Sequence, residues 1–311
     1  MSGKKDLLTK NYIVALLAMV CCILWGSAFP CVKIGYRMFG ISTGSTGSQI
    51  LFAGCRFFIA GLLVILFESV QKKRFIYPHP KDYGKVVKLS IFQTIIQYDL
   101  FYIGLANTTG VKASIIIGSN VFVAILISGL IFRIEKITFN KIAGCIVGFA
   151  GVALINMNGA DIDMSLKFTG EGFMFISTIS YSVSSVLMKR YSQDCDPVML
   201  SGWQFTFGGA VMAVTGLIAG GTMHPHSPEA FILGLYLAFI SAVAYTLWGI
   251  LLKHNPVSKV AVYGFMNPVC GVTLSALLLG ETSQAFGLKG AISLLLVCLG
   301  IYAVNFKGVK S

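Results

Sequence analysis

Long apolar runs separated by short charged links form the dominant pattern along the chain. From residue 12 to residue 306, runs of roughly 20 residues follow one another. A helix of that length spans the apolar core of a bilayer at about 1.5 Å per residue. The pattern predicts an all-α integral membrane protein with ten transmembrane helices. We place these helices at residues 12–34, 48–69, 86–106, 112–132, 140–157, 170–190, 198–219, 230–252, 258–280 and 286–306.

The chain carries part of this pattern twice. Residues 111–156 align with residues 258–305, so that Glu135 matches Glu281 and the motif GVALIN matches GIYAVN. A gene duplication explains the similarity. Because each half holds five helices, an odd number, the two halves are inverted in the membrane, which is typical of secondary transporters. The predicted parts are a tail at 1–11, a first repeat at 12–157, an external linker at 158–169, a second repeat at 170–306 and a tail at 307–311.

Composition indicates a chain that lipid must solvate. Of its 311 residues, 56% are hydrophobic and 12% are charged, and the mean hydropathy is +0.80. The net charge of +12 is spread over links and not gathered in one patch, which argues against nucleic acid as a partner. Most of the 24 basic residues fall in links on one side, the cytoplasmic side by the positive-inside rule. We therefore expect a multi-pass protein of the plasma membrane with both termini in the cytoplasm.

Little in the sequence points to an enzyme, a metal site or a cofactor. The eight cysteines contain no CxxC pair and lie mostly in apolar runs, and the four histidines all lie in links. The metalloprotease pattern HExxH does not occur, nor does the phosphate-binding pattern GxxxxGKS/T. We expect no enzyme activity, no metal and no cofactor. A passive channel would need a ring of like groups or a repeated filter sequence, so a carrier is the stronger interpretation.

Several short motifs occur in an order and spacing that match a known family. They are Trp25-Gly-Ser-Ala-Phe29 with Lys33, Arg56-Phe57, Gly104-Leu-Ala106, and Glu135 and Glu281 with the glycine-rich helix after each. On these residues the chain resembles the drug/metabolite transporter superfamily, in its ten-helix EamA-type branch, over nearly its whole length. The resemblance implies a carrier of small metabolites, often an exporter of amino acids, with a central cavity between the halves.

Two charged residues lie inside the predicted membrane helices. Arg56 and Asp99 are each about eight residues from the outer end of their helix, which places both about 12 Å deep. A charge at that depth requires a partner or a water-filled cavity. Three interpretations stay open: a buried ion pair between the two residues, a role in binding the substrate headgroup or a proton, and separate contacts of each with the membrane surface.

Uncharged polar residues indicate a cavity wall. Gln93 and Gln97 share one face of the third predicted helix, which suits either a cavity or contacts between helices. Asn120 and Asn267 occupy nearly equivalent positions of the two repeats. Pro268 removes a backbone donor beside Asn267, so the helix there is either unwound toward substrate or kinked for packing.

Aromatic and polar side chains along the axis make up the predicted site. We expect substrate contacts from Trp25, Phe29, Gln93, Gln97, Asp99, Asn120, Tyr181, Tyr245 and Asn267, with Arg56 and Asp99 as a buried ion pair or coupling group. Glu135 and Glu281 are interpreted as caps at the N-termini of the helices that follow them. The small-residue side at Gly144, Gly148 and Gly151 suits helix packing or dimerisation.

One buried acid and one buried base among aromatic rings would suit a zwitterion. We therefore predict a secondary transporter that works by alternating access and exports amino acids or related metabolites. Hydrophobic cations are the second candidate substrates. The expected partners are the solute and the lipid bilayer, and the expected assembly is a monomer or a homodimer.

Overall fold

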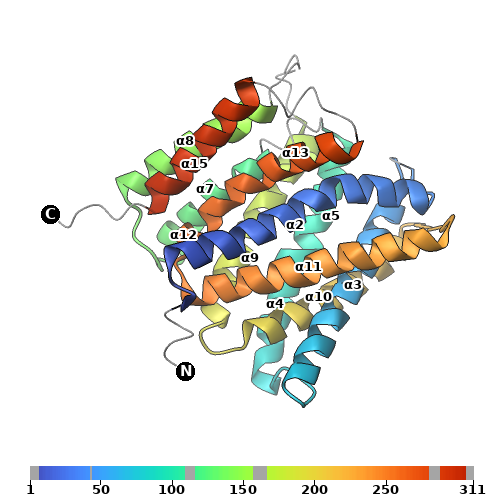
Figure 1. Cartoon of the computed structure of the whole chain (residues 1–311). Coiled ribbons are helices and arrows are strands. Elements are labelled where there is room, and N and C mark those ends of the chain that lie inside the picture. Colours follow the sequence, from blue (N-terminus) through green and yellow to red (C-terminus); the bar gives the residue numbers. More distant parts are fainter. Residues whose placement is uncertain (1–6, 43, 109–115, 157–166, 280–287, 306–311) are drawn as a thin grey trace.

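Figure 1 shows the computed structural model of the chain, a bundle of helices, in which residues 7–42, 44–108, 116–156, 167–279 and 288–305 are described. These residues form helices and links, and no strand occurs among them. Four of the described helices are long and apolar enough to cross a membrane, namely α2 (Asn11–Met38), α3 (Thr46–Gln71), α10 (Pro197–Ile218) and α11 (Pro228–His254). The predicted all-helical membrane fold is confirmed at this level.

The other predicted runs are helical too, in shorter or composite form. Single helices are α8 (Phe139–Asn156) and α15 (Leu288–Asn305). The third run holds the 3-10 turn η1 (Pro80–Asp82), α4 (Tyr83–Ser90), the π-helical turn η2 (Ile91–Ile95) and α5 (Ile96–Ala106). The fourth run holds α7 (Asn120–Leu126) and the π-helical turn η3 (Ile127–Ile131). The sixth run holds the π-helical turn η4 (Phe168–Gly172) and α9 (Phe173–Tyr191). The ninth run holds α12 (Val257–Ala261), the 3-10 turn η5 (Val262–Phe265) and α13 (Met266–Leu279). Glu281 and most of the predicted linker lie outside the described residues.

Glycines let α3 and α10 pack at backbone contact. A Cβ atom on Gly54 would lie 2.3 Å from the backbone nitrogen of Ala213, and one on Gly209 would lie 2.3 Å from that of Phe58. Crowding recurs seven residues away in each direction, against backbone atoms at Gly47 and Gly61 of α3 and Gly216 of α10, and against the Ile65 side chain at Gly202 of α10. Seven residues are two helical turns, so each helix presents one smooth stripe to the other.

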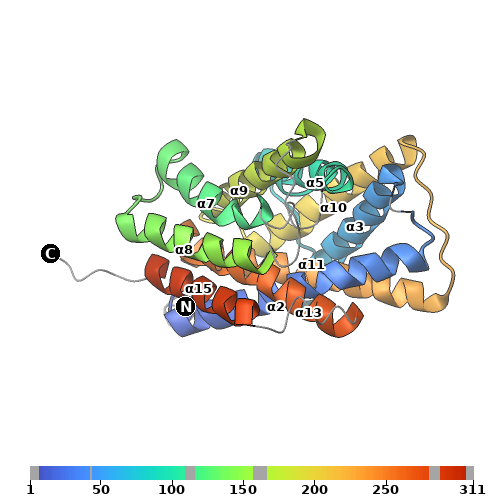
Figure 2. The same cartoon turned by 90° about the horizontal axis from the view of Figure 1, so that it is seen from above.

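Small residues also join α8 to α15. A Cβ atom on Gly144 would lie 2.8 Å from the carbonyl oxygen of Gly300, and one on Gly151 would lie 2.8 Å from that of Ser293. The hydroxyl of Ser293 donates to the carbonyl oxygen of Gly151. Figure 2 shows the two helices side by side at one edge of the bundle. The predicted small-residue side of α8 therefore packs within the chain.

Helices of one half of the chain pack mainly against helices of the other half. The first helix, α2, lies between α11 and α13, as Figure 1 shows. The first long helix of the second half, α9, packs against α5 and α7 (Figure 2). The pairs α3 with α10 and α8 with α15 also join the halves. The two halves are thus interlocked.

The links form two groups. In one group the side-chain nitrogen of Asn255 donates to the carbonyl of Leu8 at 2.9 Å, and Lys72 pairs with Asp196. In the other group the backbone nitrogen of His224 donates to the carbonyl of Phe39 at 2.9 Å. The hydroxyl of Thr108 likewise donates to Glu171 at 2.6 Å, and the backbone nitrogen of Thr222 to the hydroxyl of Ser48 at 3.0 Å. Each group joins links that the sequence places on one side of the membrane, while the side that faces the cytoplasm stays a prediction.

Candidate functional site

An aromatic cluster occupies the middle of the bundle. The ring of Trp25 lies edge-on to the rings of Tyr245 and Trp248, with 5.0 Å between centroids in each case. The hydroxyls of Tyr98 and Tyr245 share a hydrogen bond of 2.5 Å, and the ring centroids of Phe57 and Tyr98 lie 4.4 Å apart. These rings come from α2, α3, α5 and α11, so the cluster lies where the two halves meet. Trp25 and Tyr245, two of the predicted site residues, thus lie in contact, and their binding of substrate stays a prediction.

Arg56 of α3 lies beside this cluster. Its side chain is 7% exposed, and its guanidinium carbon stands 4.5 Å from the centre of the Phe57 ring. The hydroxyls of Tyr36, Tyr98 and Tyr245 are within electrostatic range of its charge. Its Nε atom is buried and has no hydrogen-bond partner. The described residues thus give this charge a cation–π contact and no ion pair.

Asp99 lies apart from Arg56. None of the ion pairs among the described residues includes either residue, and the Oδ1 atom of Asp99 is buried without a hydrogen-bond partner. Tyr98, the residue before Asp99, packs against the Phe57 ring that Arg56 covers. Successive residues of a helix point about 100° apart, so the Asp99 side chain points in another direction. The direct ion pair that the sequence suggested is therefore absent from this conformation.

The polar face of the third run divides into two parts. Ser90 and Thr94 hold α10, because the hydroxyl of Ser90 donates to the carbonyl of Gln204 at 2.9 Å and that of Thr94 to its side-chain oxygen at 2.7 Å. Gln93 and Gln97 keep side-chain oxygens that are buried without a partner. The first two residues connect helices, whereas the side-chain oxygens of the two glutamines make no hydrogen bond between helices. Gln204 was not among the predicted residues. Its place as a polar residue within the apolar run of α10 is the signal that could have identified it.

The π-helical turn η2 lies at the centre of this face. The hydroxyls of Ser177 and Ser180, both on α9, donate at 2.6 Å to the backbone carbonyls of Gln97 and Phe92. A π-helical turn interrupts the regular hydrogen bonds of an α-helix, and such turns occur often at functional sites. The serines of α9 therefore hold an irregular segment of the first half beside the cluster, and Gln93 lies within that segment.

A closed cavity lies between α7, α9, α11 and the turn before α13. Its lining consists of Asn120, Ala124, Tyr181, Ser185, Trp248, Leu252, Ala261 and Gly264. Two predicted site residues, Asn120 and Tyr181, thus share one cavity. Its volume of about 10 Å³ is at most enough for one water molecule. A metabolite does not fit, so this conformation is closed around the predicted path. A larger hollow of about 360 Å³ on α3, at Leu62 and Leu66, is almost entirely apolar and faces outward.

The break before Asn267 meets the Trp25-Gly26 motif. The 3-10 turn η5 precedes α13, and the side-chain oxygen of Asn267 in its first turn is buried without a partner. A Cβ atom on Gly26 would lie 2.9 Å from the backbone of Cys270. Gly26 is therefore required where α2 passes the irregular start of α13. Phe29 belongs to the same part of α2, and its side chain lies outside the described residues.

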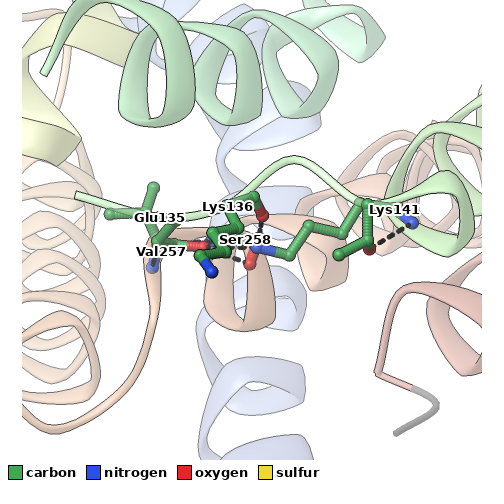
Figure 3. A network of polar contacts seen from close by, with 6 residues as sticks. Glu135, Lys136, Lys141, Val257 and Ser258 are labelled. Carbon is green, nitrogen blue, oxygen red and sulfur yellow. Dashed lines mark hydrogen bonds and ion pairs between the residues drawn. The ribbon is translucent and has the colours of Figure 1, made fainter. Parts of the chain in front are cut away.

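Glu135 joins the halves at one end of the bundle, as Figure 3 shows. Its carboxylate accepts hydrogen bonds from the backbone nitrogens of Val257 and Ser258 and from the Ser258 hydroxyl. The Lys141 side chain pairs with it at 2.9 Å. Glu135 was expected to cap the helix that follows it. It instead caps α12 of the second half, because its link reaches across the bundle.

The surroundings of Glu135 favour its ionised form. Burial would raise the pKa of this carboxyl group, but the hydrogen bonds from Ser258 and Lys141 and the charge of Lys141 together outweigh burial and lower the pKa below its ordinary value of 4.5. The capped helix end adds a favourable dipole. The contact is therefore charged and fully formed at neutral pH.

Several known proteins of similar sequence are named as transporters. The model of the EamA-like transporter family matches residues 12–157 and 168–306. A WAT1-related chloroplast protein of Arabidopsis thaliana is 27% identical over 91% of this chain and 67% of its own length. A Salmonella typhimurium protein named "probable amino-acid metabolite efflux pump" is 25% identical over 94% of this chain and 95% of its own. A crystal structure with 15% identity has the same fold at a TM-score of 0.75, over 94% of this chain and 97% of that one. The chain belongs to the EamA-like transporter family.

Proposed function

We propose that the chain is a secondary transporter that exports amino acids or related metabolites across the plasma membrane by alternating access. The observation that carries this proposal is the exchange of partners between the halves. If the ten predicted helices are paired as first with sixth, second with seventh and so on, α2 corresponds to α9, and α11 and α13 correspond to α5 and α7. The contacts of α2 with α11 and α13 then repeat as those of α9 with α5 and α7.

This exchange supports two inverted repeats around one axis. The same pairing exchanges α3 with α10 and α8 with α15. The contact between the two helices of each pair therefore maps onto itself, as a contact on a two-fold axis must. Such an arrangement allows two conformations of similar energy, one open to each side. The cavity of about 10 Å³ fits a closed intermediate between them.

The central residues favour a zwitterionic solute. Arg56 and Asp99 form no ion pair with each other, and Gln93 and Gln97 add amide oxygens without a partner. The name of the Salmonella relative points to the same substrate class. We place both termini in the cytoplasm on the distribution of basic residues.

Hydrophobic cations are the second candidate. The half-buried Asp99 carboxylate has one buried oxygen without a partner, and the rings of Trp25, Tyr245 and Trp248 offer cation–π contacts to a hydrophobic cation.

Counterflow in liposomes tests the proposal. Liposomes with purified protein are preloaded with an unlabelled amino-acid mixture, and the entry of each labelled amino acid is measured, with tetraphenylphosphonium as the cation probe. A carrier gives entry that the internal solute accelerates, whereas a channel gives entry that it does not. Entry of no compound above protein-free liposomes would overturn the proposal.

A further inference from the structure

Arg56 is a charge that the packing of the helices does not explain. Its side chain is 7% exposed and so does not reach the membrane surface. None of the ion pairs in the described part of the chain includes it, and its buried Nε has no partner. Leaving a buried cation without an opposite charge is unfavourable, and membrane proteins that keep one generally use it.

The groups around Arg56 are hydroxyls and rings. Tyr98 and Tyr245 satisfy each other through their shared hydrogen bond, whereas the buried Tyr36 hydroxyl lies beside Tyr102 and has no hydrogen bond of ordinary length. No ion pair in the described part of the chain joins Asp99 to Arg56, so that acid does not neutralise the arginine. The guanidinium and this hydroxyl therefore offer several N–H and O–H donors, and the described neighbours supply no anion to accept them.

We propose that Arg56 and Tyr36 bind the carboxylate of the transported solute. This inference rests on the proposed transport function and names the class of its substrate, a small molecule that carries a carboxylate beside an apolar or aromatic group. The two oxygens of a carboxylate match the parallel N–H bonds of a guanidinium. Tyr36 supplies one further donor, and it packs in one cluster with Tyr98, Tyr245 and the Phe57 ring that Arg56 covers.

The charge of Arg56 also separates the two substrate candidates. A carboxylate entering the bundle neutralises the arginine, so the loaded site holds less unpaired charge than the empty one. A hydrophobic cation without an acid group would meet an uncompensated positive charge instead. The site thus selects for the acid group itself, and replacing that group with a neutral amide should abolish most of the binding.

Counterflow with matched solutes tests this selection. Each labelled amino acid is compared with its carboxamide, which keeps the side chain and the amine and lacks the carboxylate, in liposomes with wild-type protein, Arg56→Gln, Arg56→Lys or the control Arg37→Gln. Arg37 is exposed at the end of α2. We expect wild-type and Arg37→Gln proteins to prefer the acid over its amide by about 10- to 100-fold, the value of a hydrogen-bonded charge. Arg56→Gln should lose this preference, and Arg56→Lys should keep part of it.

The outcomes separate the inference from the function on which it rests. Wild-type protein that carries amides or tetraphenylphosphonium as well as acids overturns the carboxylate site and leaves a transporter. An unchanged acid preference in Arg56→Gln overturns it too. Wild-type protein that carries none of these compounds overturns the transport proposal itself.

Thermal unfolding without any solute gives an independent measurement. If Arg56 binds solute and does not hold helices together, the Arg56→Gln substitution removes an unpaired buried charge. The variant protein should then unfold at the same temperature as wild type or at a higher one. A marked fall in the unfolding temperature, together with loss of transport, would assign Arg56 to the packing of the helices and overturn the inference.

Discussion

At the scale of single residues, the structure separates polar groups that hold helices from polar groups that are left free. Ser90 and Thr94 belong to the first kind, since both donate to Gln204. Gln93, Gln97 and Asp99 belong to the second. Sequence position places all of them on membrane helices but does not reveal their partners, because a partner such as Gln204 lies more than 100 residues away.

Asp99→Asn tests the free carboxylate. We expect the variant to fold with unchanged or higher thermal stability, because the amide needs less solvation than a partnerless carboxylate. Its transport should be lost or should no longer depend on a proton gradient, as counterflow with and without an imposed gradient would show. A fully active variant with the same gradient dependence would remove Asp99 from the site.

At the scale of helices, the length of each apolar run determined what could be predicted. The predicted range 48–69 became α3 at Thr46–Gln71, and 140–157 became α8 at Phe139–Asn156. The irregular turns η2 and η5 were not foreseen, because π-helical and 3-10 turns have no sequence signature comparable to hydrophobic periodicity. Pro268 did indicate an irregularity, and the turn lies just before it.

The glycine stripe between α3 and α10 gives a prediction at this scale. Gly54→Ala should lower the stability by about 1–3 kcal/mol, because its methyl group would overlap the α10 backbone. Gly84→Ala is the matched control, since a Cβ atom there meets open space. The control should gain roughly 0.5–1 kcal/mol from helix propensity. Thermal unfolding in detergent measures both, and equal shifts would mean that the stripe is not tightly packed.

The Glu135 contact predicts a pH dependence. Because folding lowers the pKa of this carboxyl group, its contribution is complete above its unfolded pKa of 4.5 and is lost as pH falls through the lower folded value. Glu135→Gln should therefore cost about 1–3 kcal/mol at pH 7 and progressively less below pH 4.5.

Unfolding temperatures of wild type, Glu135→Gln and the control Asp194→Asn, measured from pH 7 to pH 3.5, check this. Asp194 is exposed in the link between α9 and α10. A difference between wild type and Glu135→Gln that stays constant at all pH values would show that the carboxylate charge does not contribute.

At the scale of the whole molecule, the alternation of charged links predicts which ends meet. The contacts of Asn255 with Leu8 and of His224 with Phe39 agree with that alternation. The interlocking of the halves could not be predicted, because a repeat in sequence does not say whether its copies pack side by side or through each other. The cap from Glu135 to α12 is one result of that interlocking.

Cysteine labelling tests the sidedness. In a background without the eight native cysteines, we expect Lys73→Cys to react with an impermeant thiol reagent only from the cytoplasmic side. Asp161→Cys, in the linker between the halves, should react only from outside. Reaction of both positions from one side would contradict inverted halves.

The interlocked halves also have a consequence for biosynthesis. The last residue of α13 lies about 120 residues after the end of α8, a length that the ribosome makes in about 6–25 s at about 5–20 residues per second. During that time α2 lacks α11 and α13, and the glycine stripe of α3 lacks α10. The first half must therefore wait in the membrane with its contact faces open to lipid and to other nascent chains. We therefore expect insertion machinery or chaperones to shield those faces until the second half is made.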